Sequence, residues 1–287
     1  WYLRFNFLRL WRMVKLSFQY GTGQQAPFEA STRYLVLDIG PQCLAVLVCQ
    51  SQTGLVEAAE LYSGLSDPEA DWQEMTNRSS LLGYRHLETR VVFHFSRAMA
   101  IPSVLFQPAA AATQLNLLYG GQAAQSPSSD IHRDQGMIWY WEAPAVWHQL
   151  LRRHFEQFTV SHVGSWIAGL LATPPPLQSA ENGRGVAVFY PGLAWMGITT
   201  AGQLQVLRPV VLTSPADAAY YMMALTKQAG LLYAQTPWQC YGMLEVDSAI
   251  WQSIDEYLGM ATLPQPIPQQ ALPHWYFGYL TGPRTFL

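Results

Sequence analysis

Apolar residues form short, nearly continuous runs in the first part of the chain, and turn residues separate these runs. Residues 34–49 are rich in Val and Leu, residues 52–54 supply a Gln-Thr-Gly turn, and residues 55–62 can return beside them. Runs of this length between turn signals predict strands, so we expect an antiparallel meander. Asp67-Pro68 then opens a predicted helix over 67–82, because proline is favoured in the first helical turn.

The remainder of the first half alternates between strand and helix patterns. ETRVVFHFS alternates as a half-buried strand does, whereas GGQAAQSPSSD holds only small and polar residues and is the clearest exposed loop. The helix predicted at APAVWHQLLRRHFEQF has one apolar face. The expected order is a strand at 88–96, an extended piece at 100–106, a helix at 108–119, a loop at 120–130, a strand at 136–143, a helix at 143–158, a strand at 159–163 and a helix at 165–172.

A proline-rich stretch divides the chain, and a second set of elements follows it. The three prolines of TPPPLQSAENGRG (173–185) fit neither a helix interior nor a central strand. GVAVFY, a turn at Pro191-Gly192, WMGITTA and LQVLRPVVL then predict a second meander. A helix is expected to begin at Ser214, with Pro215 and Asp217 in its first turn. A strand at QCYGMLEV and a helix at DSAIWQSIDEYL complete the second half.

The repeated order of meander, helix, strand and helix indicates that one α/β unit has been duplicated. Two such units that face each other form the architecture of actin-like ATPases, whose core is RNase H-like. We therefore expect an α/β chain with a first subdomain at 33–173, a linker at 174–185 and a second subdomain at 186–287. Residues 1–32 are expected to be an N-terminal extension, of which residues 1–12 lie upstream of the native start.

Composition narrows the classes of partner. Hydrophobic residues make up 50% of the chain and charged residues only 12%, which excludes a disordered chain. The net charge of −3 differs from the positive charge with which nucleic-acid-binding proteins neutralise phosphates, so we expect no nucleic-acid partner. No apolar run approaches the roughly 18 residues of a transmembrane segment. Cys43, Cys49 and Cys240 are too few for a disulfide framework, and they predict reduced thiols in a cytoplasmic protein.

Four stretches of the chain carry a resemblance to a known family. They are AIPSVLFQPAAAATQL, GQLQVLRPVVLTSPADAAYYMMALTKQAGL, CYGMLEVDSAIWQSIDEYL and LPHWYFGYL, and the second places Asp217, Tyr220 and Tyr221 on one helix. Over roughly residues 33–280 the chain resembles an uncharacterised bacterial family known as domain of unknown function 3822, whose fold is similar to that of actin-like ATPases. Because the function of that family is unknown, the resemblance implies a fold and no activity.

The first hairpin keeps only part of what a nucleotide site requires. Actin-like ATPases use two hairpins whose turn amides hold phosphate oxygens and whose acidic residues position Mg²⁺. Asp38 and Gly40 are present here, but Pro41 lacks an N–H and Gln42 and Cys43 replace the usual small or hydroxylated residues. Asp38 is therefore expected to cap its own turn rather than to bind a metal ion.

The second hairpin and the adenosine region depart further from the working pattern. No Asp or Glu occurs between residues 182 and 216, so the turn at Gly192 offers a cation no charged ligand. The glycine pair of the adenosine region reads Tyr241-Gly242-Met243 and keeps one glycine. We therefore interpret Asp38, Gly40, Gly192 and Gly242 as a vestigial cleft. We expect no catalytic residue, no metal site and no cofactor.

A metal-dependent nuclease is a weaker interpretation of the same core topology. Such enzymes need several converging carboxylates for two metal ions. The later acids that could join Asp38 are Asp130, Asp217, Glu245 and Asp247, of which Asp217 and Asp247 are accounted for as helix-start residues.

The remaining hypotheses concern binding. The favoured one is a catalytically inactive scaffold or protein-interaction module, with a protein partner or self-association. Its candidate contact surfaces are the aromatic strings at 139–141 and 275–277, although a buried sheet explains either string more simply. The alternative is a nucleotide-binding ATPase with an atypical phosphate site, and a third possibility is a small-molecule site between the two lobes.

Overall fold

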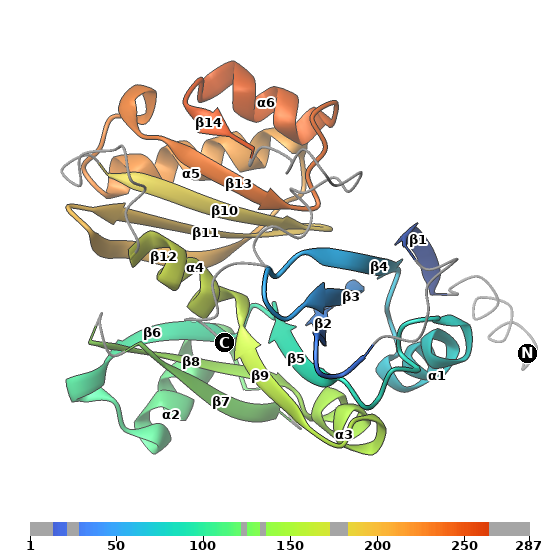
Figure 1. The fold of residues 1–287 in the computed structure, drawn as a ribbon. Helices are drawn as coiled ribbons and strands as arrows, with labels where there is room; N and C mark the ends of the chain where they lie inside the picture. Colours follow the sequence, from blue (N-terminus) through green and yellow to red (C-terminus); the bar gives the residue numbers. More distant parts are fainter. Residues whose placement is uncertain (1–13, 22–28, 122–124, 133–135, 173–182, 264–287) are drawn as a thin grey trace, which may run out of the picture.

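Three sheets and six α-helices make up the described part of the chain (Figure 1). The structure is a computed structural model, and it describes residues 14–21, 29–121, 125–132, 136–172 and 183–263. Within those ranges no helix is both long enough and apolar enough to cross a membrane.

The first lobe is built on a sheet with the order β1-β4-β3-β2-β5-β9. Its meander β2-β3-β4 is antiparallel, whereas β5 and β9 run parallel to β2. The central strands are buried along almost their whole length, because helices or neighbouring sheets cover both faces. The strands are β1 Lys15–Tyr20, β2 Arg33–Ile39, β3 Cys43–Gln50, β4 Val56–Ser63, β5 Glu88–Phe93 and β9 Phe158–His162.

The second lobe repeats this arrangement in a five-stranded sheet. Its order β12-β11-β10-β13-β14 matches β4-β3-β2-β5-β9 strand for strand, with the same antiparallel meander and the same parallel pairs. The predicted duplication of one α/β unit is thereby confirmed. The strands are β10 Arg184–Tyr190, β11 Leu193–Thr200, β12 Gln203–Val211, β13 Trp238–Gly242 and β14 Ala261–Thr262.

A small subdomain is inserted between β5 and β9. It consists of a sheet with the order β6-β8-β7 and of α2, which packs on one face of that sheet. β7 begins inside the stretch 120–130 that the sequence predicted to be a loop, so that prediction was wrong from residue 125 onward. Its QSPSSDIH sequence has no apolar alternation, and pairing with β8 decides its conformation. The elements are β6 Ala98–Pro102, the short 3₁₀ helix η1 Ser103–Leu105, α2 Pro108–Tyr119, β7 Gln125–His132 and β8 Met137–Pro144.

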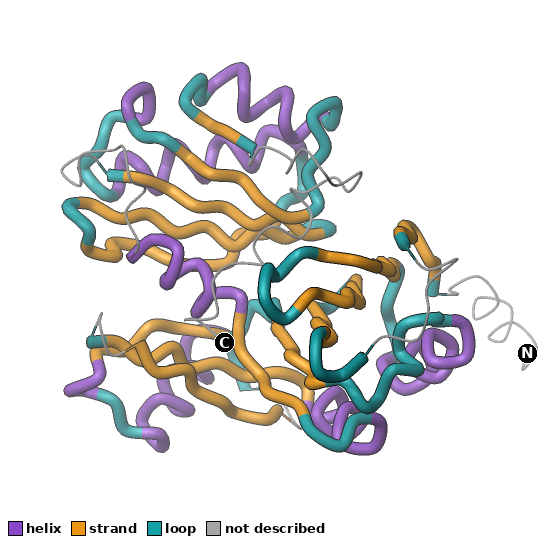
Figure 2. Tube along the Cα trace, viewed as in Figure 1, coloured by secondary structure: helices purple, strands orange, loops and turns teal. Residues whose placement is uncertain are grey.

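The other helices cover the outer surfaces of the lobes or lie between them. α1 and α3 contact each other beside the first sheet, α5 and α6 contact each other beside the second, and α4 lies between the lobes (Figures 1 and 2). The predicted start of α5 is confirmed, because Asp217 accepts hydrogen bonds from the backbone N–H groups of Thr213 and Ser214. The helices are α1 Pro68–Arg78, α3 Ala145–His154, α4 Val163–Ala172, α5 Pro215–Gln228, η3 Tyr233–Gln235 and α6 Ala249–Tyr257.

Two details depart from the predicted division of the chain. β1 lies within the predicted extension 1–32, yet it pairs with β4 and belongs to the first sheet. α4 was assigned to the first subdomain, but it also contacts β10, β11 and β12 of the second lobe. Residues 1–12, most of the linker 174–185 and the aromatic string 275–277 lie outside the described residues.

One of the three buried hydrophobic clusters of the described residues extends from the first lobe into the second. Val186, Val188 and Trp195 of the second lobe belong to the same buried cluster as the strands of the first sheet. Trp139 and Trp141 are fully buried in this cluster, while Tyr140 is buried beneath α2. The string 139–141 is therefore part of a buried sheet, as the simpler of its two interpretations held, and it is not a contact surface. Alternation in β8 sends its aromatic rings to opposite faces of the small sheet, and both faces are covered.

A buried ion pair fixes the small subdomain. Arg97 donates to Glu142 Oε2 from Nε at 3.0 Å and from Nη2 at 2.9 Å, and both side chains are buried. The same guanidinium donates to Asn116 Oδ1 and to the carbonyl of Gly120 at the C-terminal end of α2. Arg97 therefore joins α2 to the sheet on which it packs.

We expect Glu142→Ala to lower the free energy of unfolding by roughly 3–5 kcal/mol, because the substitution leaves the Arg97 cation buried without its counter-charge. Urea denaturation measures this loss. The control is Glu88→Ala, since Glu88 is 62% exposed in its ion pair with Arg90 and its loss costs at most about 1 kcal/mol. Equal effects of the two substitutions would contradict the structural role of Arg97.

Candidate functional site

The four predicted cleft residues lie close to a region where the carboxyl ends of β2, β5 and β10 face the other lobe. In open α/β sheets this edge is where ligands bind. Asp38 lies near the end of β2, and His94 directly follows β5, the parallel neighbour of β2. Nδ1 of His94 lies 2.8 Å from Oδ1 of Asp38, and both side chains are only 1% exposed. The predicted capping carboxylate is thus bonded to a histidine.

The ring of His94 packs directly against the first hairpin. Its ring stacks on Tyr190 at the end of β10, with centroids 3.7 Å apart and planes 9° apart. A Cβ atom built on Gly40 would lie 1.7 Å from Nε2 of His94, so only glycine leaves room for the ring. One imidazole therefore lies between the first hairpin and the second lobe.

Structural constraints also account for the two other glycines. Gly192 has φ +69° at the tip of a two-residue turn between Tyr190 and Leu193, a conformation that favours glycine. A Cβ on Gly192 would lie 3.9 Å from Oε1 of Gln42, so the two hairpin tips are neighbours. Gly242 has φ +87°, and its Cβ would lie 2.3 Å from the carbonyl oxygen of Phe189.

The hairpin tips offer few amides to an anion. In the first turn the N–H of Gly40 already donates to the carbonyl of Cys43 at 3.0 Å, and Pro41 has no N–H. In the second turn Pro191 also lacks an N–H, which leaves one turn amide at Gly192. A phosphate-binding turn needs several amides that point to one place.

Cys43, His94 and Asp38 follow one another in the order of a cysteine-nucleophile triad. Sγ of Cys43 lies 3.6 Å from Nε2 of His94, on the side of the ring opposite to Asp38. The electrostatics do not suit a nucleophile, because burial and then the charge of Asp38 raise the pKa of the Cys43 thiol well above its usual value. A reactive cysteine needs a lowered pKa and access to substrate. Cys43 is buried, so the three groups form a structural hydrogen-bonded chain.

A second histidine lies beside the first and also has its hydrogen bonds satisfied. His162 Nδ1 accepts from the indole N–H of Trp139 at 2.8 Å, and its Nε2–H donates to the carbonyl of Phe95 at 2.8 Å. Burial lowers the pKa of His162 to about 3, so the ring is neutral. Trp195 packs edge-on against His162 and donates to the carbonyl of His94 at 3.3 Å. His94, Trp139, His162, Tyr190 and Trp195 form what we call the interlobe cluster.

These residues do not fit a magnesium-bound nucleoside triphosphate. The carboxylate of Asp38 is buried against His94, and the ring of His94 stacks on Tyr190 where the two hairpins meet. In the described ranges no three His, Cys, Asp or Glu side chains are grouped so that they could hold a metal ion. Asp130, one of the acids considered for a nuclease, is instead bonded to the N–H of His162 and the hydroxyl of Ser165.

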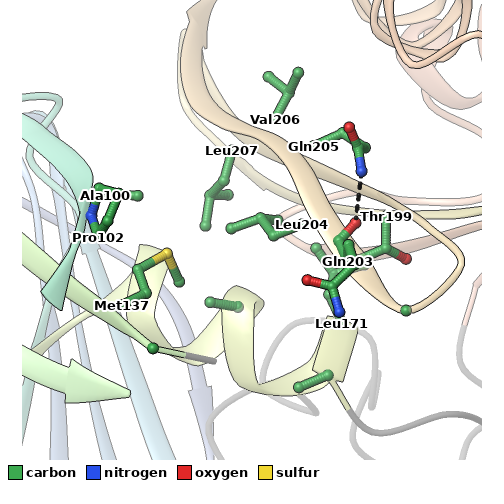
Figure 3. A pocket seen from close by; sticks show the side chains of 14 residues that line it. Ala100, Pro102, Met137, Leu171, Thr199, Gln203, Leu204, Gln205, Val206 and Leu207 are labelled. Carbon is green, nitrogen blue, oxygen red and sulfur yellow. Dashed lines mark hydrogen bonds between the residues drawn. The ribbon is translucent and has the colours of Figure 1, made fainter. Parts of the chain in front are cut away.

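A cavity of about 490 Å³ lies away from the hairpins, between β6, β8, α4 and the β11–β12 turn (Figure 3). A bulge in β12 pairs Leu204 with Thr199 and Val206 with Ile198, which places Gln205 outside the regular ladder. Leu204 and Leu207 consequently pack on the same side, toward the core shared by the lobes. None of the described lining residues carries a charge, so this cavity cannot neutralise a phosphate.

Sequence reasoning missed His94 and Tyr190, although a signal for both exists. Each residue ends or directly follows a strand whose carboxyl end points to the cleft. Comparing the ends of β2, β5 and β10 would have placed Asp38, His94 and Tyr190 together. The stacking itself depends on how the two lobes face each other, and no local pattern encodes that.

One family model matches most of the chain. The family model described as "Protein of unknown function (DUF3822)" matches residues 24–259. The chain belongs to this family. The match includes three of the four stretches on which the resemblance rested and ends before LPHWYFGYL. No curated protein matches the sequence.

One solved structure confirms the predicted actin-like α/β fold of this DUF3822 member. A Bacteroides thetaiotaomicron protein with an actin-like ATPase fold and unknown function superposes with a TM-score of 0.70 at 10% identity, over 83% of this chain and 94% of that one. The ethanolamine utilization protein EutJ from Carboxydothermus hydrogenoformans superposes with a TM-score of 0.43 at 9% identity, over 84% of this chain and 86% of that one. A chain of the PilM-PilN type IV pilus biogenesis complex superposes with a TM-score of 0.46 at 12% identity, over 80% of this chain and 88% of that one.

If Asp38 is a structural partner of His94, Asp38→Ala destabilises the protein. We expect a loss of roughly 2–4 kcal/mol in the free energy of unfolding, because the imidazole N–H stays buried without an acceptor. Urea denaturation measures this loss. The control is Asp67→Ala, which removes the exposed N-terminal cap of α1 at a cost of about 1 kcal/mol. A stability that stays equal or rises would instead indicate a carboxylate kept for ligand binding.

The raised pKa of the Cys43 thiol predicts a loss of stability at alkaline pH. The unfolded thiol ionises near its usual pKa of 9.0 while the folded thiol stays protonated, so rising pH favours the unfolded state. The stabilisation is complete below that value and declines by at most about 1.4 kcal/mol per pH unit above it. Urea denaturation between about pH 7 and pH 10 should show a steeper decline for the native chain than for Cys43→Ala. Parallel curves would contradict the prediction.

Proposed function

We propose that this chain acts through contact with a protein and does not hydrolyse a nucleotide. The observation that carries the proposal is the His94 ring, which is stacked on Tyr190 and bonded to Asp38 at the junction of the two hairpins. To admit a phosphate there, His94 would have to leave a buried hydrogen bond and a ring contact.

Electrostatics support the same proposal. Removing a donor or a charge from a transition-state site typically costs a few kcal/mol, and here both hairpins lack donors while the second lacks an acid. The net charge of −3 argues against nucleic acid as the partner. All three cysteines are free and buried, which suits a cytoplasmic protein.

A nucleotide-dependent ATPase with an atypical phosphate site is the rival proposal. It requires the interlobe cluster to open so that Asp38 can exchange His94 for a metal ion. The contacts of Trp195 with His94 and His162 oppose that opening, because they join residues of both lobes.

Isothermal titration calorimetry of the full chain with Mg-ATP compares the two proposals. We expect no saturable heat, corresponding to a dissociation constant weaker than about 1 mM. Micromolar binding that Asp38→Asn abolishes and Asp67→Ala leaves unchanged would establish the rival. Micromolar binding that neither substitution changes would place the nucleotide away from the hairpins. That result would also contradict the proposal that the chain uses no nucleotide.

A further inference from the structure

The cavity between the small subdomain and the second lobe is lined by three separate parts of the fold (Figure 3). β6 and the start of β8 form one side, the C-terminal half of α4 forms the second, and the β11–β12 hairpin forms the third. Its volume of about 490 Å³ lies within the range of small-molecule sites, which occur preferentially where domains meet. The size and the position are those of a site for a small molecule.

Small residues leave this space unfilled on all three sides. Ala100 of β6, Ala168 and Ala172 of α4 and Gly202 of the β11–β12 turn line the cavity. A Cβ atom built on Gly202 would have no heavy atom within 4 Å apart from its chain neighbours. Large aromatic rings fill the junction of the lobes at the interlobe cluster, whereas here short side chains keep a cavity open.

The backbone supplies the cavity with uncharged hydrogen-bonding groups. β6 and β12 both line it, and each is the edge strand of its sheet. One side of each backbone therefore has no partner strand in the part of the chain that the structure describes, and such groups need a partner when they are covered. The bulge takes Gln205 out of the regular ladder, and Nε2 of Gln205 donates to the carbonyl of Gln203 at 3.3 Å (Figure 3).

Aliphatic side chains form another part of the wall. Leu204 and Leu207 of β12 point toward Met137 of β8 across the cavity (Figure 3). Leu171 of α4 also lines it. An apolar ligand body would remove this surface from water, which favours binding.

The charge of the wall decides the class of ligand. None of the described lining residues is ionised at neutral pH. Arg184 pairs with Thr199 of the wall, but its guanidinium donates to the carbonyls of Leu170 and Leu171 at 2.6 and 2.8 Å. A carboxylate, a phosphate or an ammonium group placed here would lose hydration without gaining an opposite charge.

We propose that this cavity binds a small uncharged molecule that has an apolar body and a hydroxyl or amide group. The body packs between Leu204, Leu207 and Met137, and the polar group bonds to the edge of β12 beside Gln205. The site lies away from the hairpins, so the proposal goes beyond the proposed function. It holds whether the chain acts through a protein contact or through a nucleotide.

Displacement of the uncharged fluorescent dye Nile red from the full chain tests the proposal. We expect saturable dye binding with a dissociation constant of about 1–50 µM. Decanol, decanoate and decylammonium have the same chain length and differ in the charge of the head group, so they form a matched series of competitors. Decanol should displace the dye at a concentration at least about tenfold lower than either charged compound.

Two substitutions of Ala100 locate the site. Ala100 is exposed on β6 and lines the cavity, so a larger side chain there enters the cavity without disturbing the core. Ala100→Trp should weaken dye binding by at least about tenfold, whereas the control Ala110→Trp, at an exposed position of α2, should leave it unchanged. Ala100→Lys adds a cation to the wall and should make decanoate a better competitor than decanol.

Three results would overturn the proposal. A native chain that does not bind the dye overturns the site, and dye binding that Ala100→Trp leaves unchanged overturns this cavity as its location. Equal competition by the three decyl compounds overturns the uncharged class of ligand. Thermal melting checks that each variant folds. If Ala100→Trp does not fold, Ala100→Lys decides, because an unchanged order of competitors would also overturn the cavity.

Discussion

The buried contact of His94 with Asp38 and Tyr190 is the constraint on which the candidate site depends. Three strands from two lobes end at this point, and a single imidazole satisfies the carboxylate on one lobe while it stacks on the phenol of the other. Gly40 is required because the ring passes where its Cβ would be. The His94 ring is therefore packed between the first hairpin and the second lobe.

Neighbouring ring contacts also join the two lobes. Trp139 comes from the small sheet, His162 from the first and Trp195 from the second, and their rings meet in the interlobe cluster. Each polar atom of His162 is hydrogen-bonded, which allows a histidine to be buried without charge. An actin-like fold that works by lobe closure needs a cleft that can open. Here buried side chains hold the lobes together.

Much of the fold was predictable because it is encoded locally. Apolar runs separated by turn residues marked the central strands of both meanders, and Ser214-Pro215 marked the start of α5. β7 was missed because an edge strand with a polar sequence is decided by its neighbour. β1 was missed for the same reason, since its register is set by pairing with β4. At the candidate site Asp38 was identified, but its partner His94 lies 56 residues away and is found only through the parallel pairing of β2 and β5.

Long-range ¹H–¹⁵N NMR of the imidazole of His94 tests the central claim most directly. A ring held by Asp38 at Nδ1 and by Cys43 at Nε2 predicts a single set of imidazole resonances, with shifts that Mg-ATP leaves unchanged at millimolar concentration. More than one set of resonances, or His94 resonances that move as Mg-ATP is added, would contradict a ring that is held between the two lobes.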